Sequence, residues 1–122
     1  MACLSTIGEN YFVSGGSDNS LVLCDIRMTS SSGETSSDTQ CIVDHYQHCR
    51  NGVYSLCVIG NNCVVVGDGV GMVLIYDVTQ NGNEALKYGL NASSSGGVRG
   101  ITCLDGKIVT AAEDGKVLVY SY

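Results

Sequence analysis

Three stretches repeat one another along the 122-residue chain: VSGGSDNSLVLCDI (13–26), VVGDGVGMVLIYDV (65–78) and VTAAEDGKVLVYSY (109–122). They align without a gap, and their starting positions lie 52 and then 44 residues apart. A shorter apolar stretch with its own turn precedes each copy. Self-similarity at such a spacing is typical of repeat architectures. The chain is therefore predicted to contain three copies of one supersecondary unit.

The turns inside each unit predict antiparallel hairpins. Asp105-Gly106 and Asp114-Gly115 are strong signals for a two-residue hairpin, because both central residues of that turn need positive φ. Weaker forms of the signal occur at Gly8-Glu9-Asn10, Asn61-Asn62 and Asp68-Gly69.

The last strand predicted in each copy is apolar without alternation, as in residues 72–76 and 117–120. A strand with one face in water would alternate, so these strands are expected to be covered on both faces. Sheets stacked face to face, as in the blades of a propeller, supply that cover. No helical periodicity competes with this pattern. The fold class is therefore predicted to be all-β, with consecutive antiparallel sheets.

Composition narrows the class of protein further. The 44% hydrophobic content fits one small globular domain, and no apolar run reaches the ~18 residues that a membrane-spanning helix needs. A net charge of −6 argues against nucleic acid and anionic membranes as main partners. The N-terminus lacks the pattern of a secretory signal. Seven scattered cysteines, an odd number, lie mostly among aliphatic residues and are expected to be reduced. A cytoplasmic or nuclear protein is therefore expected.

Several residues of the repeat resemble a known family, the WD-repeat β-propellers. The first copy has Ser14 and Asp18 followed by Cys24-Asp25, where the family has a Trp-Asp pair. The second copy keeps the aromatic-Asp pair, and the third keeps half of it. His48 resembles the family's Gly-His element. The positions that match the family's pattern are Ser14, Asp18, Asp25, His48, Tyr76, Asp77, Thr110, Asp114 and Tyr120.

The resemblance implies a partial propeller with an incomplete polar network. In the family, a His, a Ser or Thr, an Asp and the Trp hydrogen-bond one another inside a blade. The second unit has His48 but Val66 and Val70, and the third has Thr110 and Asp114 but no His, with Ser94 and Ser95 in that region. A partly built network stabilises poorly. The blades are therefore expected to be held mainly by apolar packing.

The repeats predict three units: 1–44 with a Ser/Thr-rich loop at 28–40, 45–90, and 91–122 without its outer strand. Closed propellers use roughly four to eight blades, so three cannot close a ring. The chain is expected to be a fragment, or to complete its ring with blades of a parent or another chain. The loop is expected to be a plain solvated linker; the alternative is phosphorylation of hydroxyls beside Glu34 and Asp38.

One cluster could hold a metal. Cys41, His45, His48 and Cys49 provide soft ligands within nine residues, but their spacing matches no usual zinc pattern. A strand followed by a connecting loop with His48 is the preferred interpretation. Residues 67–71 have spaced glycines but precede a strand, so phosphate binding is not expected. With two histidines, both in one loop, no nucleophile–base pair emerges. We therefore expect no catalytic residue and no cofactor.

The function predicted is a non-catalytic interaction scaffold that binds peptides or proteins, as a partner- or substrate-recruiting subunit of a larger complex. By the family's geometry, the loops before each first strand and the hairpins after each second strand share one face. The candidate residues on that face are Ser17, Arg50, Tyr54, Arg99 and Glu113. Each has the alternative of being an ordinary solvated side chain. A zinc-binding interaction module and a non-functional truncated gene product are the other hypotheses.

Overall fold

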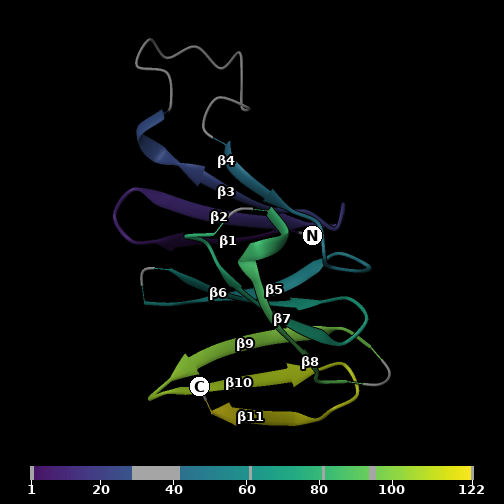
Figure 1. Ribbon diagram of the computed structural model, residues 1–122. Helices are drawn as coiled ribbons and strands as arrows, with labels where there is room; N and C mark the ends of the chain where they lie inside the picture. The colour runs from purple at the N-terminus through teal and green to yellow at the C-terminus, as the bar shows by residue number, and fades with distance from the viewer. Residues whose placement is uncertain (1, 29–41, 61, 81, 94–95, 122) are drawn as a thin grey trace.

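A computed structural model describes residues 2–28, 42–60, 62–80, 82–93 and 96–121. It contains three antiparallel sheets that follow one another along the chain and stack face to face (Figure 1). The first sheet consists of β1 (Ala2–Ile7), β2 (Tyr11–Gly16), β3 (Leu21–Asp25) and β4 (Ile42–Tyr46). The second consists of β5 (Val53–Ile59), β6 (Cys63–Asp68), β7 (Met72–Asp77) and β8 (Leu86–Asn91). The third consists of β9 (Val98–Leu104), β10 (Lys107–Ala112) and β11 (Val117–Ser121).

Two short 3-10 helices are the only other regular elements in the described ranges, η1 (Ile26–Met28) and η3 (Gly82–Ala85). No helix among the described residues is long and apolar enough to cross a membrane. The fold class is therefore all-β, as the repeats predicted. Apart from Met28, the predicted Ser/Thr-rich loop lies outside the described residues, as do Glu34 and Asp38.

Strand pairing moves two boundaries that the repeats had suggested. β4 pairs with β3 as far as Tyr46, and β8 pairs with β7 as far as Asn91. The first two sheets thus end at Tyr46 and Asn91 rather than at 44 and 90. The outer strand of each sheet differs in sequence between units, which is why repeat comparison placed its end poorly.

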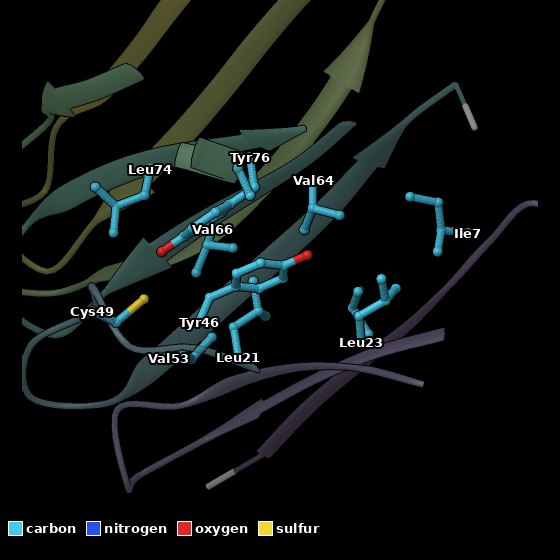
Figure 2. Close-up of a cluster of buried hydrophobic side chains, with 12 residues drawn as sticks. Ile7, Leu21, Leu23, Tyr46, Cys49, Val53, Val64, Val66, Leu74 and Tyr76 are labelled. Carbon is cyan, nitrogen blue, oxygen red and sulfur yellow. The ribbon is translucent and has the colours of Figure 1, made fainter. Parts of the chain in front are cut away.

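Two apolar layers hold the three sheets together. One lies between the first and second sheets and is drawn in Figure 2, where Tyr46 and Tyr76 meet with ring centroids 5.0 Å apart. The other lies between the second and third sheets, around Val65, Val73 and Val98. Each layer covers one face of the second sheet, so the inner strands of that sheet are covered on both faces, whereas residues 87–89 of the outer strand β8 stay exposed.

The position of β7 explains its unbroken apolar sequence. Leu74 and Tyr76 pack toward the first sheet, whereas Val73 packs toward the third. The prediction that both faces are covered is confirmed for β7. It is wrong for β11 within the described residues, since Val117 and Val119 are 64% and 58% exposed.

One close approach repeats at both sheet-to-sheet contacts. A Cβ placed on Gly15 would lie 2.5 Å from Cγ1 of Val53, and one placed on Gly67 would lie 2.7 Å from Cβ of Val98. These glycines occupy the same position in their units, and so do these valines. Each valine at the start of an inner strand therefore presses against a glycine of the preceding sheet, in a space that only hydrogen fits.

A polar contact repeats beside it. The thiol of Cys3 donates to the carbonyl oxygen of Val53 at 3.3 Å, and the hydroxyl of Ser55 donates to that of Val98 at 2.8 Å. Cys3 and Ser55 are equivalent positions of successive units. Burial raises the pKa of the Cys3 thiol. At both sheet contacts, the carbonyl oxygen of the equivalent valine thus accepts a hydrogen bond from the preceding sheet.

The tight turns agree with the sequence at one of the two strong sites. Asp105 and Gly106 both have positive φ, 50° and 76°, as predicted. In the second pair only Gly115 does, at 83°, so that prediction is wrong for Asp114. The carboxylate of Asp114 instead accepts the backbone N–H of Lys116 at 3.0 Å, which favours ordinary backbone angles at the aspartate.

The weaker signal at Asp68-Gly69 is also misplaced. Neither residue has positive φ; the left-handed residue of this hairpin is Gly71, at φ 100°. Asp68 is the last residue of β6 and is almost fully buried. The Asp68 carboxylate accepts backbone N–H groups of the turn, from Val70 and Met72, and Asp68 is not itself a central residue of the turn.

Candidate functional site

Two β-bulges turn Tyr54 and Arg99 toward one end of the stack. Val53 pairs with Asp68, and Ser55 with Gly67, so Tyr54 is an extra residue in β5. The ladder between β9 and β10 has the same irregularity, which leaves Arg99 as the extra residue. Bulges often re-aim a side chain beside a functional site. The two bulged residues are equivalent positions of adjacent sheets.

The bulged side chains meet each other. The guanidinium carbon of Arg99 lies 4.6 Å from the centroid of the Tyr54 ring, within the range of a cation–π contact. Arg99 Nη2 also lies 2.9 Å from Glu113 Oε2. The Arg99 side chain nevertheless keeps 50% of its exposure. An arginine is thus fixed in place while still facing solvent.

Glu113 is fixed from a second direction. The backbone N–H of Gly97 donates to Glu113 Oε1 at 2.7 Å, and the N–H of Glu113 donates to the carbonyl oxygen of Gly97 at 3.0 Å. The Gly97 N–H, and next the Arg99 guanidinium, lower the pKa of the Glu113 carboxyl. A Cβ on Gly97 would lie 2.5 Å from the Tyr54 ring, so glycine is needed here. The carboxylate therefore stays ionised and holds Arg99 at neutral pH.

The β2–β3 hairpin of the first sheet contacts the loop that precedes β5, at the same end of the stack as Tyr54 and Arg99. Asn19 Oδ1 accepts the N–H of Gly52 at 2.6 Å. A Cβ on Gly52 would lie 3.3 Å from Cα of Ser17 and 3.6 Å from Cε1 of Tyr54. Arg50 is exposed in the same loop, and its N–H donates to Asp68 Oδ2 at 3.2 Å. One chain of contacts thus runs from the first hairpin to Tyr54.

The five residues predicted for one face therefore lie at one end of the stack, in contiguous loops and hairpins. Arg99 contacts both Tyr54 and Glu113 directly, and Ser17 and Arg50 flank the Gly52 turn beside them. Sequence reasoning missed the residues that position them, chiefly Asn19, Asp68 and Gly97. For Gly97, the only signal in the sequence is that a glycine precedes the first strand of both the second and the third sheet.

An aspartate organises the hairpin of each unit at this end. Asp18 Oδ1 accepts the N–H of Ser20 at 3.2 Å, and Asp114 Oδ1 accepts that of Lys116 at 3.0 Å. In the second unit Asp68 Oδ1 accepts the equivalent N–H, from Met72, at 2.8 Å. Asp68 precedes the aligned position by two residues. The expectation that the second unit lacks this aspartate is therefore wrong.

The other members of the family-like network are partly replaced. In the second unit His48 Nδ1 lies 3.1 Å from the hydroxyl of Tyr76. In the third unit the Ser93 hydroxyl donates to Asp114 Oδ2 at 2.9 Å, and Thr110 is buried. The expected substitutes Ser94 and Ser95 lie outside the described residues. The third unit thus uses a serine at the position equivalent to His48.

The matched positions near the opposite end cap turns or pack. Asp25 accepts two bonds from the Arg27 guanidinium, which lowers the pKa of its carboxyl. Asp77 Oδ1 accepts both the N–H and the hydroxyl of Thr79, which lowers its pKa likewise. The remaining matched side chains are half-buried: Ser14, on β2, and Tyr120, which packs between the second and third sheets.

The possible zinc ligands are dispersed. His45 is exposed on β4, and His48 contacts Tyr76, whereas Cys49 is buried, which raises the pKa of its thiol to about 12. Cys41 lies outside the described residues. Among the residues that the structure describes, no three His, Cys, Asp or Glu side chains group as metal ligands. The preferred interpretation, a strand followed by a loop with His48, agrees with β4 and residues 47–52.

The structure also has an apolar groove that sequence reasoning did not find. It measures about 390 Å³ and lies between the second and third sheets. Its lining is Ile59, Cys63, Ile75, Tyr88, Leu90, Ile108, Tyr120 and Ser121. The groove reaches β11, which pairs only with β10 in the described part of the chain.

Comparisons with known proteins agree with this geometry. No protein-family profile matches the chain, and no curated protein matches it in sequence. Among solved structures it is similar to the WD40 β-propeller domain of Doa1, with a TM-score of 0.77 and 18% identity over 98% of this chain and 36% of that one. It is also similar to the computationally designed Ika4 protein, with a TM-score of 0.75 and 21% identity over 97% of this chain and 63% of that one. The chain is also similar to the computationally designed Ika8 protein, with a TM-score of 0.74 and 21% identity over 98% of this chain and 32% of that one.

The chain therefore spans less than two thirds of the length of each of these proteins. Identities of 18–21% speak for the fold alone. The three stacked sheets have the fold of consecutive β-propeller blades.

Proposed function

We propose that this chain is a non-catalytic scaffold that binds a peptide or protein through the end of the stack formed by Ser17, Arg50, Tyr54, Arg99 and Glu113. The observation that carries the proposal is the half-exposed Arg99, held between the Tyr54 ring and the Glu113 carboxylate of adjacent blades. Arginine and tyrosine dominate binding energy at protein interfaces. A side chain fixed before binding loses little conformational entropy on association.

The fold supports the same class of function. WD40 domains, which this chain resembles in structure, are generally scaffolds for protein interactions. A rigid stack of sheets with hairpins gathered at one end suits that role. We further propose that the chain recruits a partner or substrate within a larger complex.

Exchange of Arg99 for glutamate tests this face. The change removes the cation that faces solvent and puts a repelling charge next to Glu113, so partner affinity is expected to fall by about tenfold or more. Affinity capture with quantitative mass spectrometry identifies the partners, and titration of each purified partner then measures the loss.

Arg27 provides a matched control at the opposite end of the stack. Its guanidinium carbon lies 5.7 Å from the Tyr11 ring centroid, and it pairs with Asp25 at 2.9 Å, much as Arg99 does with Tyr54 and Glu113. Arg27→Glu should leave partner affinity unchanged. If every partner binds Arg99→Glu as tightly as it binds the unaltered chain, Arg99 has no part in recognition.

We also propose that further blades, from a second copy or from a parent chain, cover the two flanks of the stack. On the third sheet Leu104, Val117 and Val119 are 58–66% exposed. The same positions of the first sheet, Ile7, Leu21 and Leu23, are buried against the second sheet. A face that is buried in one unit and bare in another suits a further blade. An outer strand supplied with that blade would pair with the free edge of β11, beside the apolar groove.

Light scattering on the purified 122-residue chain, over a range of concentrations, measures whether it associates and so tests whether the flanks are covered. We expect it to associate, and Val119→Glu on one flank or Leu4→Glu on the other to prevent association. Each variant retains one unaltered flank, so an equimolar mixture of the two should recover a complex through the remaining pair of flanks. Lys87→Glu, on the exposed side of β8, should associate normally. A well-folded monomer at all concentrations contradicts the proposal.

A further inference from the structure

Two cysteines of neighbouring blades meet at the contact between the second and third sheets. Cys57 lies on β5 and Cys103 on β9, and their sulfur atoms are 2.9 Å apart. Both are free thiols and both are half-buried. They are separated by 46 residues in sequence, so only the stacking of the blades brings them together.

This pair is not part of the repeated contact. The positions equivalent to Cys57 and Cys103 at the first sheet contact are Ser5 on β1 and Val58 on β5. A serine and a valine serve the same packing there, so thiols are not required for the blades to stack. The sequence predicts reduced cysteines that lie mostly among aliphatic residues, and no motif marks this pair.

From this placement we infer that Cys57 and Cys103 form a dithiol site, which a small disulfide such as oxidised glutathione converts into a bond between the two blades. A protein disulfide has an S–S length of about 2.05 Å, so the sulfurs need to approach by less than about 1 Å.

The reaction proceeds by two thiol–disulfide exchanges. The Cys57 thiolate attacks one sulfur of oxidised glutathione, forms a mixed disulfide and releases a glutathione thiolate. The Cys103 thiolate then attacks the Cys57 sulfur, which breaks the mixed disulfide and releases the second glutathione thiolate. Each released thiolate takes up one of the two protons lost by the cysteines. The protein loses two electrons and two protons, and one glutathione disulfide becomes two thiols.

The surroundings of Cys103 favour this order. Burial, and next the neighbouring Cys57, raise the pKa of Cys103 to about 12, so its thiolate is rare. An attack by Cys103 on a dissolved oxidant is therefore slow. Its attack on a mixed disulfide at Cys57 is intramolecular, because the acceptor sulfur is already beside it.

The bond would tie together the two inner strands that also carry Tyr54 and Arg99. It closes a loop between β5 and β9, and a cross-link of that length restricts the unfolded chain. The thermal midpoint of the oxidised chain is therefore expected to rise by on the order of 10 °C and to return to its starting value with dithiothreitol.

The full chain is incubated with oxidised glutathione under native conditions, and the remaining thiols are alkylated. Intact mass measured before alkylation should fall by two hydrogens, and peptide mapping after alkylation should find Cys57 linked to Cys103. Cys63→Ser is the matched control, because this nearby thiol also lines the contact. It should form the bond normally, whereas Cys57→Ser or Cys103→Ser should lose both the bond and the gain in thermal midpoint.

Two results overturn the inference. One is full alkylation of Cys57 and Cys103 in the oxidised, folded wild-type chain. The other is a bond that joins different cysteines. Mapping of the wild-type chain decides the matter even if a serine variant fails to fold.

Discussion

Exchange of Asp68 for alanine is expected to lower the free energy of unfolding by about 3–5 kcal/mol, a large part of the stability of a small domain. The Asp68 carboxylate is almost fully buried and accepts three backbone N–H groups, from Arg50 at 3.2 Å, Val70 at 3.1 Å and Met72 at 2.8 Å. Alanine leaves all three donors without this acceptor. Urea unfolding followed by circular dichroism measures the loss as a lower midpoint at unchanged slope.

Asp18 offers the matched control for this prediction. It occupies the β2–β3 hairpin, but it is exposed, and the contact described for its side chain is the N–H of Ser20 at 3.2 Å. Asp18→Ala should therefore cost less than about 1 kcal/mol. Equal costs for the two variants would mean that burial and the number of donors do not decide the role of Asp68. Asp68→Asn, which retains one acceptor oxygen, should fall between the two.

Asp68 also shows why the repeats predicted the sheets better than the site. A period in the sequence reports the strands and turns that recur, and it located the strands and the hairpins between them, though not the backbone angles at Asp114 and Asp68-Gly69. The aspartate of the second unit lies two residues before its aligned position, although it accepts the equivalent N–H. Ser93 replaces histidine in a similar way. Alignment follows residue identity by position, whereas a hydrogen bond needs only an acceptor within reach.

The contacts between blades were the hardest features to predict from the sequence. Tyr54 and Arg99 were expected on one face from the family's geometry, but their contact depends on two bulges that no local pattern marks. Cys57 and Cys103 meet for the same reason, through the stacking of β5 on β9. Such pairs depend on how two sheets slide and twist against each other. That arrangement is a property of the packed layers and not of either strand alone.

Gly67→Ala tests the contact between the second and third sheets and is expected to cost about 1–3 kcal/mol of unfolding free energy. The added Cβ would lie 2.6 Å from Ser55 Oγ and 2.7 Å from Cβ of Val98, which is fully buried. The valine cannot move aside without separating β9 from the second sheet. Differential scanning calorimetry and urea titration should both show the loss.

Gly89→Ala, in β8 of the same sheet, should instead raise the free energy of unfolding. There the new Cβ would meet Met72 at 3.5 Å, an ordinary contact, so the smaller entropy of the unfolded chain should stabilise the protein by about 0.4–1 kcal/mol. Val98→Ala supplies the second comparison. It removes Val98 Cγ1, which the new Cβ would meet at 2.8 Å, and the smaller alanine relieves part of the crowding even though its Cβ remains. The Gly67→Ala, Val98→Ala double variant should lose less than the sum of the single losses, by about 0.5 kcal/mol or more. Strict additivity would show that Gly67 and Val98 do not press on each other, and with it the close approach between neighbouring blades would have to be abandoned.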